Sequence, residues 1–213
     1  MSAKLSQEKA LIFRILHRDN VRWLLANGMH CDNSDIRDPN YVSIGNAELI
    51  GKRRNHPVPC PPGGMLSDYV PFYFTPFSPM LYNIKTGYGG IRRRSNSEIV
   101  IAVSSLLDLQ ALGMPFVFTD RHAYLQMARY FTDLSDLTEI DWTILRNRDF
   151  KRDPDDPGKF ERYQAEALVH RNMPCKALAG IMCYDDETVA GVQRMVDLGG
   201  LKMRVVKSPN WYF

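Results

Sequence analysis

PCPPGGMLSDYVPFYFTPFSPMLY, residues 59–82, combines six prolines with a dense group of large aromatic side chains. Proline cannot donate a hydrogen bond to a strand ladder, so much of this stretch cannot lie in regular structure. Aromatic side chains of this size are expected to be buried or stacked. We predict a short edge strand at residues 69–74, entered and left by rigid turns. It forms either the wall of a binding pocket or an ordinary loop of the hydrophobic core.

Short apolar segments outside this stretch predict the other strands, at residues 11–16, 98–103, 115–119, 164–170, 181–184 and 203–206. Amphipathic patterns between them predict helices, at residues 19–28, 47–54, 104–112, 121–131, 141–148 and 186–199. No period typical of repeat proteins recurs, which excludes a solenoid. The chain is therefore expected to form a single domain, residues 1–213, in which strands and helices alternate in a mixed α/β order.

Length and composition are those of an ordinary globular protein. The chain has 213 residues, of which 45% are hydrophobic and 24% are charged, so wholesale disorder and a fibrous repeat are both excluded. Lys and Arg outnumber Asp and Glu by 27 to 24. The resulting net charge of +3 is too small for a protein that coats nucleic acid, although it allows a local basic groove.

The cysteines and the N-terminus indicate where the protein works. Its four cysteines are scattered and form no CxxC pair, so we expect reduced thiols and no metal site. The N-terminal residues lack the apolar core of a secretory signal, and no apolar run approaches the roughly 18 residues of a membrane span. These features predict a soluble, cytoplasmic protein that does not contact membranes.

Several common enzyme signatures are missing from the chain. Nothing matches the phosphate-binding patterns GxxxxGK[ST] or GxGxxG after a strand, and neither HExxH nor GxSxG occurs. Their absence argues against a Walker-type kinase, a Rossmann dehydrogenase, a zinc protease and an α/β-hydrolase.

Three residues taken singly could carry chemistry. Glu166 would stand in a predicted strand, where a carboxylate is costly unless it is paired or lines a cleft. Arg54, beside Arg53, could clamp a phosphate group, and His122 follows a strand, where ligand sites often occur. Each has a plainer interpretation: a solvated strand residue, a basic helix end and a surface histidine.

Two basic segments could grip the phosphates of a nucleic acid. The first is the triplet Arg92, Arg93 and Arg94, which follows a glycine-rich turn, and the second spans residues 146–152 and includes Arg148. The alternative for both is a solvated charged loop.

Taken together and in order, the motifs resemble one family. The segments KRRNHPVPCPPGGMLSDYVPFYFTPFSPMLY (residues 52–82), PFVFTDRHAY (115–124) and KFERYQAEALVH (159–170) are similar to those of DarT DNA ADP-ribosyltransferase toxins. The opening FRILHRDNVRWLLANG (13–28) resembles the first strand and helix of that family. The resemblance extends to the C-terminal residues.

The resemblance implies a fold and an activity. The fold would be the α+β ADP-ribosyltransferase fold, in which two packed, partly split β-sheets surround an NAD cleft with flanking helices. The activity would be transfer of ADP-ribose from NAD⁺ onto a base of single-stranded DNA, with release of nicotinamide. The resemblance also implies a macrodomain antitoxin that removes the modification.

Position by position, the resemblance makes Glu166 the catalytic glutamate, Arg54 the catalytic arginine and His122 the site histidine. Residues expected to bind NAD⁺ are Arg14, Leu16, Asn20, Tyr73 and Met80. Arg14 and Leu16 stand where better-known relatives carry His and Thr, a departure that fits a subgroup modifying guanine rather than thymine. The basic residues expected to contact DNA are Arg92, Arg93, Arg94 and Arg148.

Two alternatives remain open from the sequence. The chain could use NAD⁺ to modify RNA or protein, or simply hydrolyse it. It could also be a silent nucleic-acid-binding module in which Glu166 and Arg54 form a structural ion pair.

Overall fold

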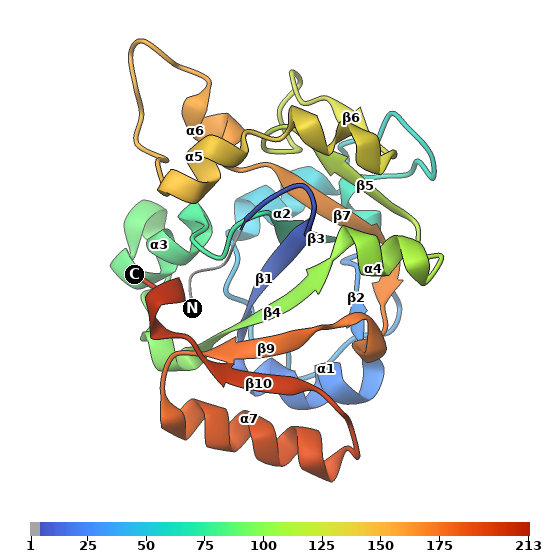
Figure 1. Cartoon of the computed structure of the whole chain (residues 1–213). Coiled ribbons are helices and arrows are strands. Elements are labelled where there is room, and N and C mark those ends of the chain that lie inside the picture. The colour runs from blue at the N-terminus through green and yellow to red at the C-terminus, as the bar shows by residue number, and fades with distance from the viewer. Residues whose placement is uncertain (1–4) are drawn as a thin grey trace.

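The computed structural model describes residues 5–213, whose strands form one large sheet and a small ribbon (Figure 1). The large sheet has eight strands in the order β10-β9-β4-β1-β3-β7-β5-β6, and β2 pairs with β8. The strands are β1 (Leu11–His17), β2 (Met29–His30), β3 (Tyr69–Tyr73), β4 (Ile99–Ser105), β5 (Phe116–Thr119), β6 (Tyr130–Phe131), β7 (Glu166–His170), β8 (Asn172–Met173), β9 (Gly180–Cys183) and β10 (Arg204–Lys207).

Across residues 5–213, seven α-helices flank these strands. They are α1 (Val21–Asn27), α2 (Ala47–Arg53), α3 (Pro79–Thr86), α4 (Leu106–Ala111), α5 (Trp142–Asn147), α6 (Lys159–Arg162) and α7 (Asp186–Leu198). The longest, α7, packs beside β9 and β10 and touches α1 (Figure 1). Within residues 5–213, every helix is too short or too polar to traverse a lipid bilayer.

The large sheet is split in the middle, which is the feature that creates the site. Strands β1 and β4 pair along their whole length, and β3 and β7 pair over five positions. Between these halves, the only residues of β1 and β3 that pair as neighbouring strand residues in the described chain are Phe13 and Tyr73. The strands diverge beyond this point, so the α+β fold with partly split sheets around a cleft is confirmed.

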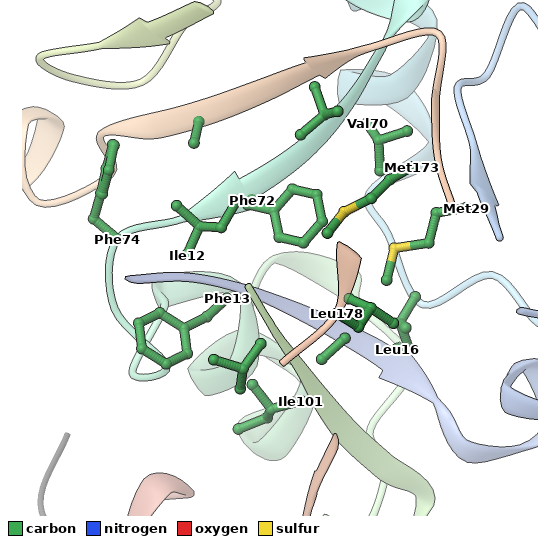
Figure 2. Close-up of a cluster of buried hydrophobic side chains, with 14 of the residues drawn as sticks. Ile12, Phe13, Leu16, Met29, Val70, Phe72, Phe74, Ile101, Met173 and Leu178 are labelled. Carbon is green, nitrogen blue, oxygen red and sulfur yellow. The ribbon is translucent and has the colours of Figure 1, made fainter. Parts of the chain in front are cut away.

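A continuous apolar core holds the two halves together (Figure 2). Val70 and Phe72 of β3 and Ile12 of β1 all lie in this core, and each residue is at most 1% exposed. Met29 and Met173, which pair in the β2–β8 ribbon, fill the end of this layer. Alternation along β3 therefore sends residues 70 and 72 into the core and leaves residues 69, 71 and 73 on the side of the cleft.

Local sequence explains how the first helix ends. Gly28 follows α1 with a φ of 80°, and a Cβ atom there would lie 2.6 Å from the backbone oxygen of Met173. Only glycine accepts both the left-handed backbone and this close approach. The turn thus brings β2 against β8 and closes the end of the core.

The predicted strand in the proline-rich stretch forms, but it is not at an edge. β3 lies between β1 and β7 in the interior of the sheet. The carbonyl of Pro71 accepts a hydrogen bond from Arg14, which shows that the backbone polar groups of Pro71 point away from β7. Its missing N–H therefore costs no ladder bond. The same stretch also contains α3, which Ser78 caps and Pro79 begins.

The helix predicted at residues 121–131 is wrong. The segment is a compact loop that ends in β6, and Ala123, which was expected on the helix face, instead gives its N–H to Glu166. Asp120 binds both the backbone N–H and the guanidinium of Arg129, which brings the two ends of the loop together. These tertiary bonds override the helical spacing of the apolar residues.

Candidate active site

A cavity of about 470 Å³ opens where β1 and β3 diverge. Its walls come from β1, α1, α2, β3, the segment that joins β2 to α2, and the loop after β5. Its lining includes Glu166 and His122 together with every residue that the sequence assigned to NAD⁺, namely Arg14, Leu16, Asn20, Tyr73 and Met80. The residues predicted to form one site are thus brought together, with one exception described below.

Glu166 is the buried acid of this cavity. It begins β7 directly opposite Tyr73, and the residue is only 3% exposed. Its carboxylate accepts hydrogen bonds from Arg53 (Nη1 to Oε2, 2.9 Å, and to Oε1, 3.2 Å) and from the backbone N–H of Ala123 (3.0 Å). The alternative interpretation, that Glu166 is a solvated strand residue, is therefore excluded.

The arginine beside Glu166 is Arg53, and the expectation that Arg54 lies there is wrong. Arg54 points outward, where its Nε donates to Asp32 at 2.8 Å, and its side chain is 55% exposed. The reason is helical geometry: Leu49, Ile50 and Arg53 share one face of α2, which all three present to the cavity. Arg54, one residue further on, leaves that face.

The environment of Glu166 keeps it ionised. Burial raises the pKa of its carboxyl, but the charges of Arg53 and His122 and the N–H of Ala123 lower it by more, so the net pKa lies below the ordinary value. Burial, followed by the charge of Glu166, raises the pKa of the neighbouring Tyr73, whose hydroxyl therefore stays protonated.

Arg53 and His122 each keep a group available for a ligand. Nη2 of Arg53 is buried and has no hydrogen-bond partner among residues 5–213. The backbone N–H of Tyr124 donates to Nδ1 of His122 at 3.2 Å, which leaves the N–H at Nε2 available to a ligand. Nδ1 lies 3.6 Å from Oε1 of Glu166, too far for a strong hydrogen bond.

Two of the predicted NAD⁺ residues are held by the protein itself. Arg14 donates from Nη1 to the carbonyl of Pro71 at 2.6 Å, and its buried Nε lacks a partner in the described chain. Asn20 is 4% exposed, and its amide binds both the carbonyl (2.9 Å) and the N–H (2.8 Å) of Val42. Asn20 therefore fastens the opposite wall of the cavity.

That opposite wall was missed by the sequence analysis. Residues 32–46, which we call the strap, contribute Ile36, Tyr41 and Ile44, among others, to the cavity. At its start Asp32 pairs with Arg54, and Asn33 donates to Asp68 at 3.0 Å. The segment is polar and rich in turn residues, so no periodic signal marks it, although the exposed Ile36 and Tyr41 hint at a ligand.

The four arginines expected to contact DNA lie elsewhere. Within residues 5–213, the cavity wall includes none of them. Arg94 pairs with Glu98 at 3.1 Å and is largely buried, and the guanidinium of Arg148 stacks over Phe77 at 3.4 Å. Both are thereby engaged with other residues, and Arg92, Arg93 and Arg148 are exposed.

The arrangement suits one kind of chemistry. A buried, ionised carboxylate can stabilise positive charge that develops on a nearby carbon and can accept a proton. A guanidinium with an unpartnered N–H beside it can hold a phosphate or a carbonyl oxygen. Tyr73 and Met80 provide an apolar wall against which a planar ring can stack.

Comparison with known proteins supports this assignment. Residues 13–213 match the family model described as DarT, ssDNA thymidine ADP-ribosyltransferase. A DNA ADP-ribosyl transferase of Escherichia coli O127:H6 is 56% identical over 212 residues, which cover 100% of this chain and 97% of the relative. A DNA ADP-ribosyl transferase of Thermus sp. (strain 2.9) is 36% identical and covers 97% of both chains.

Solved structures agree. Thermus sp. 2.9 DarT in complex with ADP-ribosylated single-stranded DNA superposes with a TM-score of 0.89 at 34% identity and covers 97% of each chain. The same protein in complex with NAD⁺ gives a TM-score of 0.85 at 33% identity, with 97% of this chain and 98% of that chain covered. Thermosipho africanus DarTG, in complex with ADP-ribose, is 17% identical and shares the fold.

Proposed function

The chain belongs to the DarT family of single-stranded-DNA ADP-ribosyltransferases, and from this premise we propose that it transfers ADP-ribose from NAD⁺ to a base of single-stranded DNA. The observation that carries the proposal is the buried Glu166–Arg53 pair in a cavity that opens at the split of the sheet. DNA is better attacked as a single strand because a paired base hides its edge and is costly to extrude.

The reaction breaks the bond between nicotinamide and C1′ of its ribose, and the bonding electrons leave with nicotinamide. The ribose then carries positive charge near C1′, which the carboxylate of Glu166 stabilises by pre-organised electrostatics. A nitrogen of the DNA base supplies the electron pair for the new bond to C1′. Its proton passes to Glu166, which acts as general base and can do so because it is ionised.

The remaining residues bind and orient. The unpartnered Nη2 of Arg53 supports a role in holding the diphosphate of NAD⁺ or a base carbonyl. Tyr73 and Met80 would stack on nicotinamide and keep water from the ribose, which limits hydrolysis. His122 would offer its Nε2 proton to a substrate oxygen.

For the acceptor base, we propose guanine, although the family description names thymidine. Arg14 supports this choice, because its guanidinium borders the cavity and its Nε awaits a partner. Guanine presents two adjacent acceptors, O6 and N7, that match an arginine fork, whereas thymine presents one acceptor beside a methyl group. Oligonucleotides that lack either guanine or thymine decide between them: modification should persist without thymine and disappear without guanine.

The phosphates of the strand could be held by Arg92 and Arg93. Both are exposed, and Tyr88, which is 71% exposed, precedes them in the same loop. An aromatic ring beside basic side chains is a common platform for single strands. Replacing both arginines by alanine should weaken DNA binding and reduce its salt dependence.

The acceptor class is tested with labelled NAD⁺ offered separately with single-stranded DNA, duplex DNA, RNA and protein. The proposal expects label on single-stranded DNA and none after Glu166→Gln. Label on RNA or protein alone would identify another acceptor, and nicotinamide release without any labelled polymer would identify a glycohydrolase. No nicotinamide release and no calorimetric binding of NAD⁺ would identify a silent module.

The DarT resemblance further supports a macrodomain antitoxin as partner, and action in the cytoplasm as a toxin. A macrodomain protein encoded beside this chain should remove ADP-ribose from the modified oligonucleotide. DNA that stays modified would count against this partner.

A further inference from the structure

Asp120 organises the loop that reaches Glu166. It follows β5 directly and is 1% exposed. Its carboxylate accepts hydrogen bonds from Nε and Nη2 of Arg121 (3.2 and 3.1 Å) and from the backbone N–H and Nε of Arg129 (3.1 and 3.0 Å). The outer guanidinium nitrogen of Arg129 continues to Glu139. One buried carboxylate thus ties both ends of the loop, residues 120–129, to each other.

The middle of this loop supplies contacts to the catalytic carboxylate. Ala123 donates its N–H to Oε1 of Glu166, and His122 lies beside the same oxygen. The loop is braced on its far side as well, because the hydroxyl of Tyr130 donates to the carbonyl of Ala123. At its base, the hydroxyl of Thr119 donates to the carbonyl of Arg121 and accepts from the N–H of Glu166.

A buried charge at this position is informative. Burial alone makes an aspartate costly, and here two arginines offset that cost. Burial raises the pKa of Asp120, and the hydrogen bonds from Arg121 and Arg129 lower it below its ordinary value, so the group is ionised. Asp120 is outside the cavity lining, which places it behind the loop and away from the substrates.

We infer that Asp120 is a positioning residue of the reaction: by gathering Arg121 and Arg129 it sets the loop that holds Glu166 and His122 in place. This inference rests on the proposed function and assigns a role to a residue that does not border the cavity. An error of about 1 Å in such a placement can lower the rate by about a hundredfold.

The role has a kinetic signature that simple destabilisation lacks. Asp120→Asn keeps the size of the side chain but removes the charge that attracts the two arginines. The loop loosens, kcat falls by about ten- to a hundredfold, and KM for NAD⁺ stays nearly unchanged because Tyr73 and Met80, which would stack on nicotinamide, keep their places.

The acidic limb of the pH–rate profile should also move. The groups that face Glu166 are Arg53 from α2, His122 and the N–H of Ala123 from the loop, Tyr73 from β3, and Tyr130 from β6. Loosening the loop weakens the contacts of His122 and Ala123, which lower the pKa of Glu166, and leaves burial, which raises it, opposed by Arg53 alone. The limb therefore shifts to higher pH in Asp120→Asn.

The experiment compares Asp120→Asn with Asp133→Asn, a control in the exposed cap that follows β6, where asparagine caps equally well. Nicotinamide release, its pH profile and hydrogen–deuterium exchange of residues 120–131 are measured on both and on the unchanged protein. We expect lower kcat, the shifted limb and faster exchange in Asp120→Asn only. Equal kcat and profiles in the two variants, or a rise in KM with an unmoved limb, would overturn the inference.

Two other outcomes would still test the inference. If Asp120→Asn does not fold, Arg129→Gln replaces it, because Arg129 is 58% exposed and its loss removes only part of the network. An unchanged profile in Arg129→Gln would then refute the inference. If the unchanged protein releases no nicotinamide, both the proposed function and the inference are wrong. If only the inference is wrong, the unchanged protein still releases nicotinamide.

Discussion

Glu166 and Arg53 form a buried ion pair in which each side chain compensates the charge of the other. Their side chains are 4% and 11% exposed, and removing one partner from such a pair leaves a charge that is costly to bury. The pair can still donate a hydrogen bond to a ligand, because Nη2 of Arg53 has no hydrogen-bond partner in the described chain. Because both side chains are charged and one N–H of the guanidinium is unpaired, the site is suited to an anionic or carbonyl ligand.

The two adjacent arginines give a matched test of this pair. Arg53→Ala should lower kcat by about 10²- to 10³-fold, since it removes a preorganised donor from the site. Arg54→Ala breaks only an exposed bridge to Asp32 and should change kcat by less than about fivefold. Steady-state nicotinamide release measures both, and the reverse ranking would show that the orientation of α2 does not serve catalysis.

Glu166 should also make stability depend on acidity. Its folded pKa lies below the ordinary value, so its contribution to the free energy of unfolding is present above about pH 4.5 and is lost as the pH falls through the lower folded pKa. Urea unfolding at pH 7 and pH 3 should therefore show a smaller acid loss for Glu166→Gln than for the unchanged protein. Equal losses would mean that Glu166 titrates as an exposed glutamate does.

Residue types were easier to predict than orientations. Glu166, His122, Tyr73 and Met80, which the motifs assigned to one site, all line one cavity. The choice between Arg53 and Arg54 was wrong, although the spacing of Leu49 and Ile50 on the same helix favours Arg53. The contact of Ala123 with Glu166 uses a backbone N–H, which no side-chain pattern encodes.

At the level of elements, Asn20 fastens the strap, which forms one wall of the cavity. Asn20 donates a hydrogen bond to the carbonyl of Val42 and accepts one from its N–H, and an exposed ion pair holds the start of the strap. The strap has no helix or strand of its own, so these bonds define its position.

Asn20→Ala should raise KM for NAD⁺ by roughly tenfold, because the loss of two hydrogen bonds lets the strap move, while kcat stays within about threefold. The matched control is Asn27→Ala, an exposed asparagine whose amide binds only the carbonyl of Trp23. Initial rates over a range of NAD⁺ concentrations test this expectation. An unchanged KM would show that the strap does not confine the substrate.

Elements with a local signal were predictable, and those defined by tertiary bonds were not. The apolar runs of β1, β4, β5, β7 and β9, and the capped helices α1, α5 and α7, all form close to the expected positions. The helix predicted after β5 was wrong because backbone N–H groups of this segment donate hydrogen bonds to Asp120 and Glu166. The two-residue strands β2 and β8 exist only as partners of each other.

For the whole molecule, the split sheet is both the core and the source of the cleft. Phe72 fills the layer between the two halves and is 1% exposed (Figure 2). Phe72→Ala should lower the free energy of unfolding by about 3–5 kcal/mol, since it leaves a large cavity between them. Leu112→Ala, at a 44% exposed position, should change it by less than about 0.5 kcal/mol. Urea titration followed by circular dichroism compares them, and similar losses would place the core elsewhere.

Periodicity alone predicted only a mixed order of strands and helices, whereas the family resemblance predicted the split architecture. The difference has a physical origin, because the split depends on β1 and β3 meeting at a single pair, Phe13 and Tyr73. These residues are 60 positions apart in the sequence, and no local pattern specifies their pairing.

Mass spectrometry of nucleosides tests the central claim most directly. Single-stranded DNA is incubated with NAD⁺ and either the unchanged protein or Glu166→Gln, and is then digested to nucleosides. A deoxynucleoside that carries one ADP-ribose should form with the unchanged protein and be absent with Glu166→Gln. Unmodified nucleosides alongside free ADP-ribose, or equal modification by both proteins, would contradict the account.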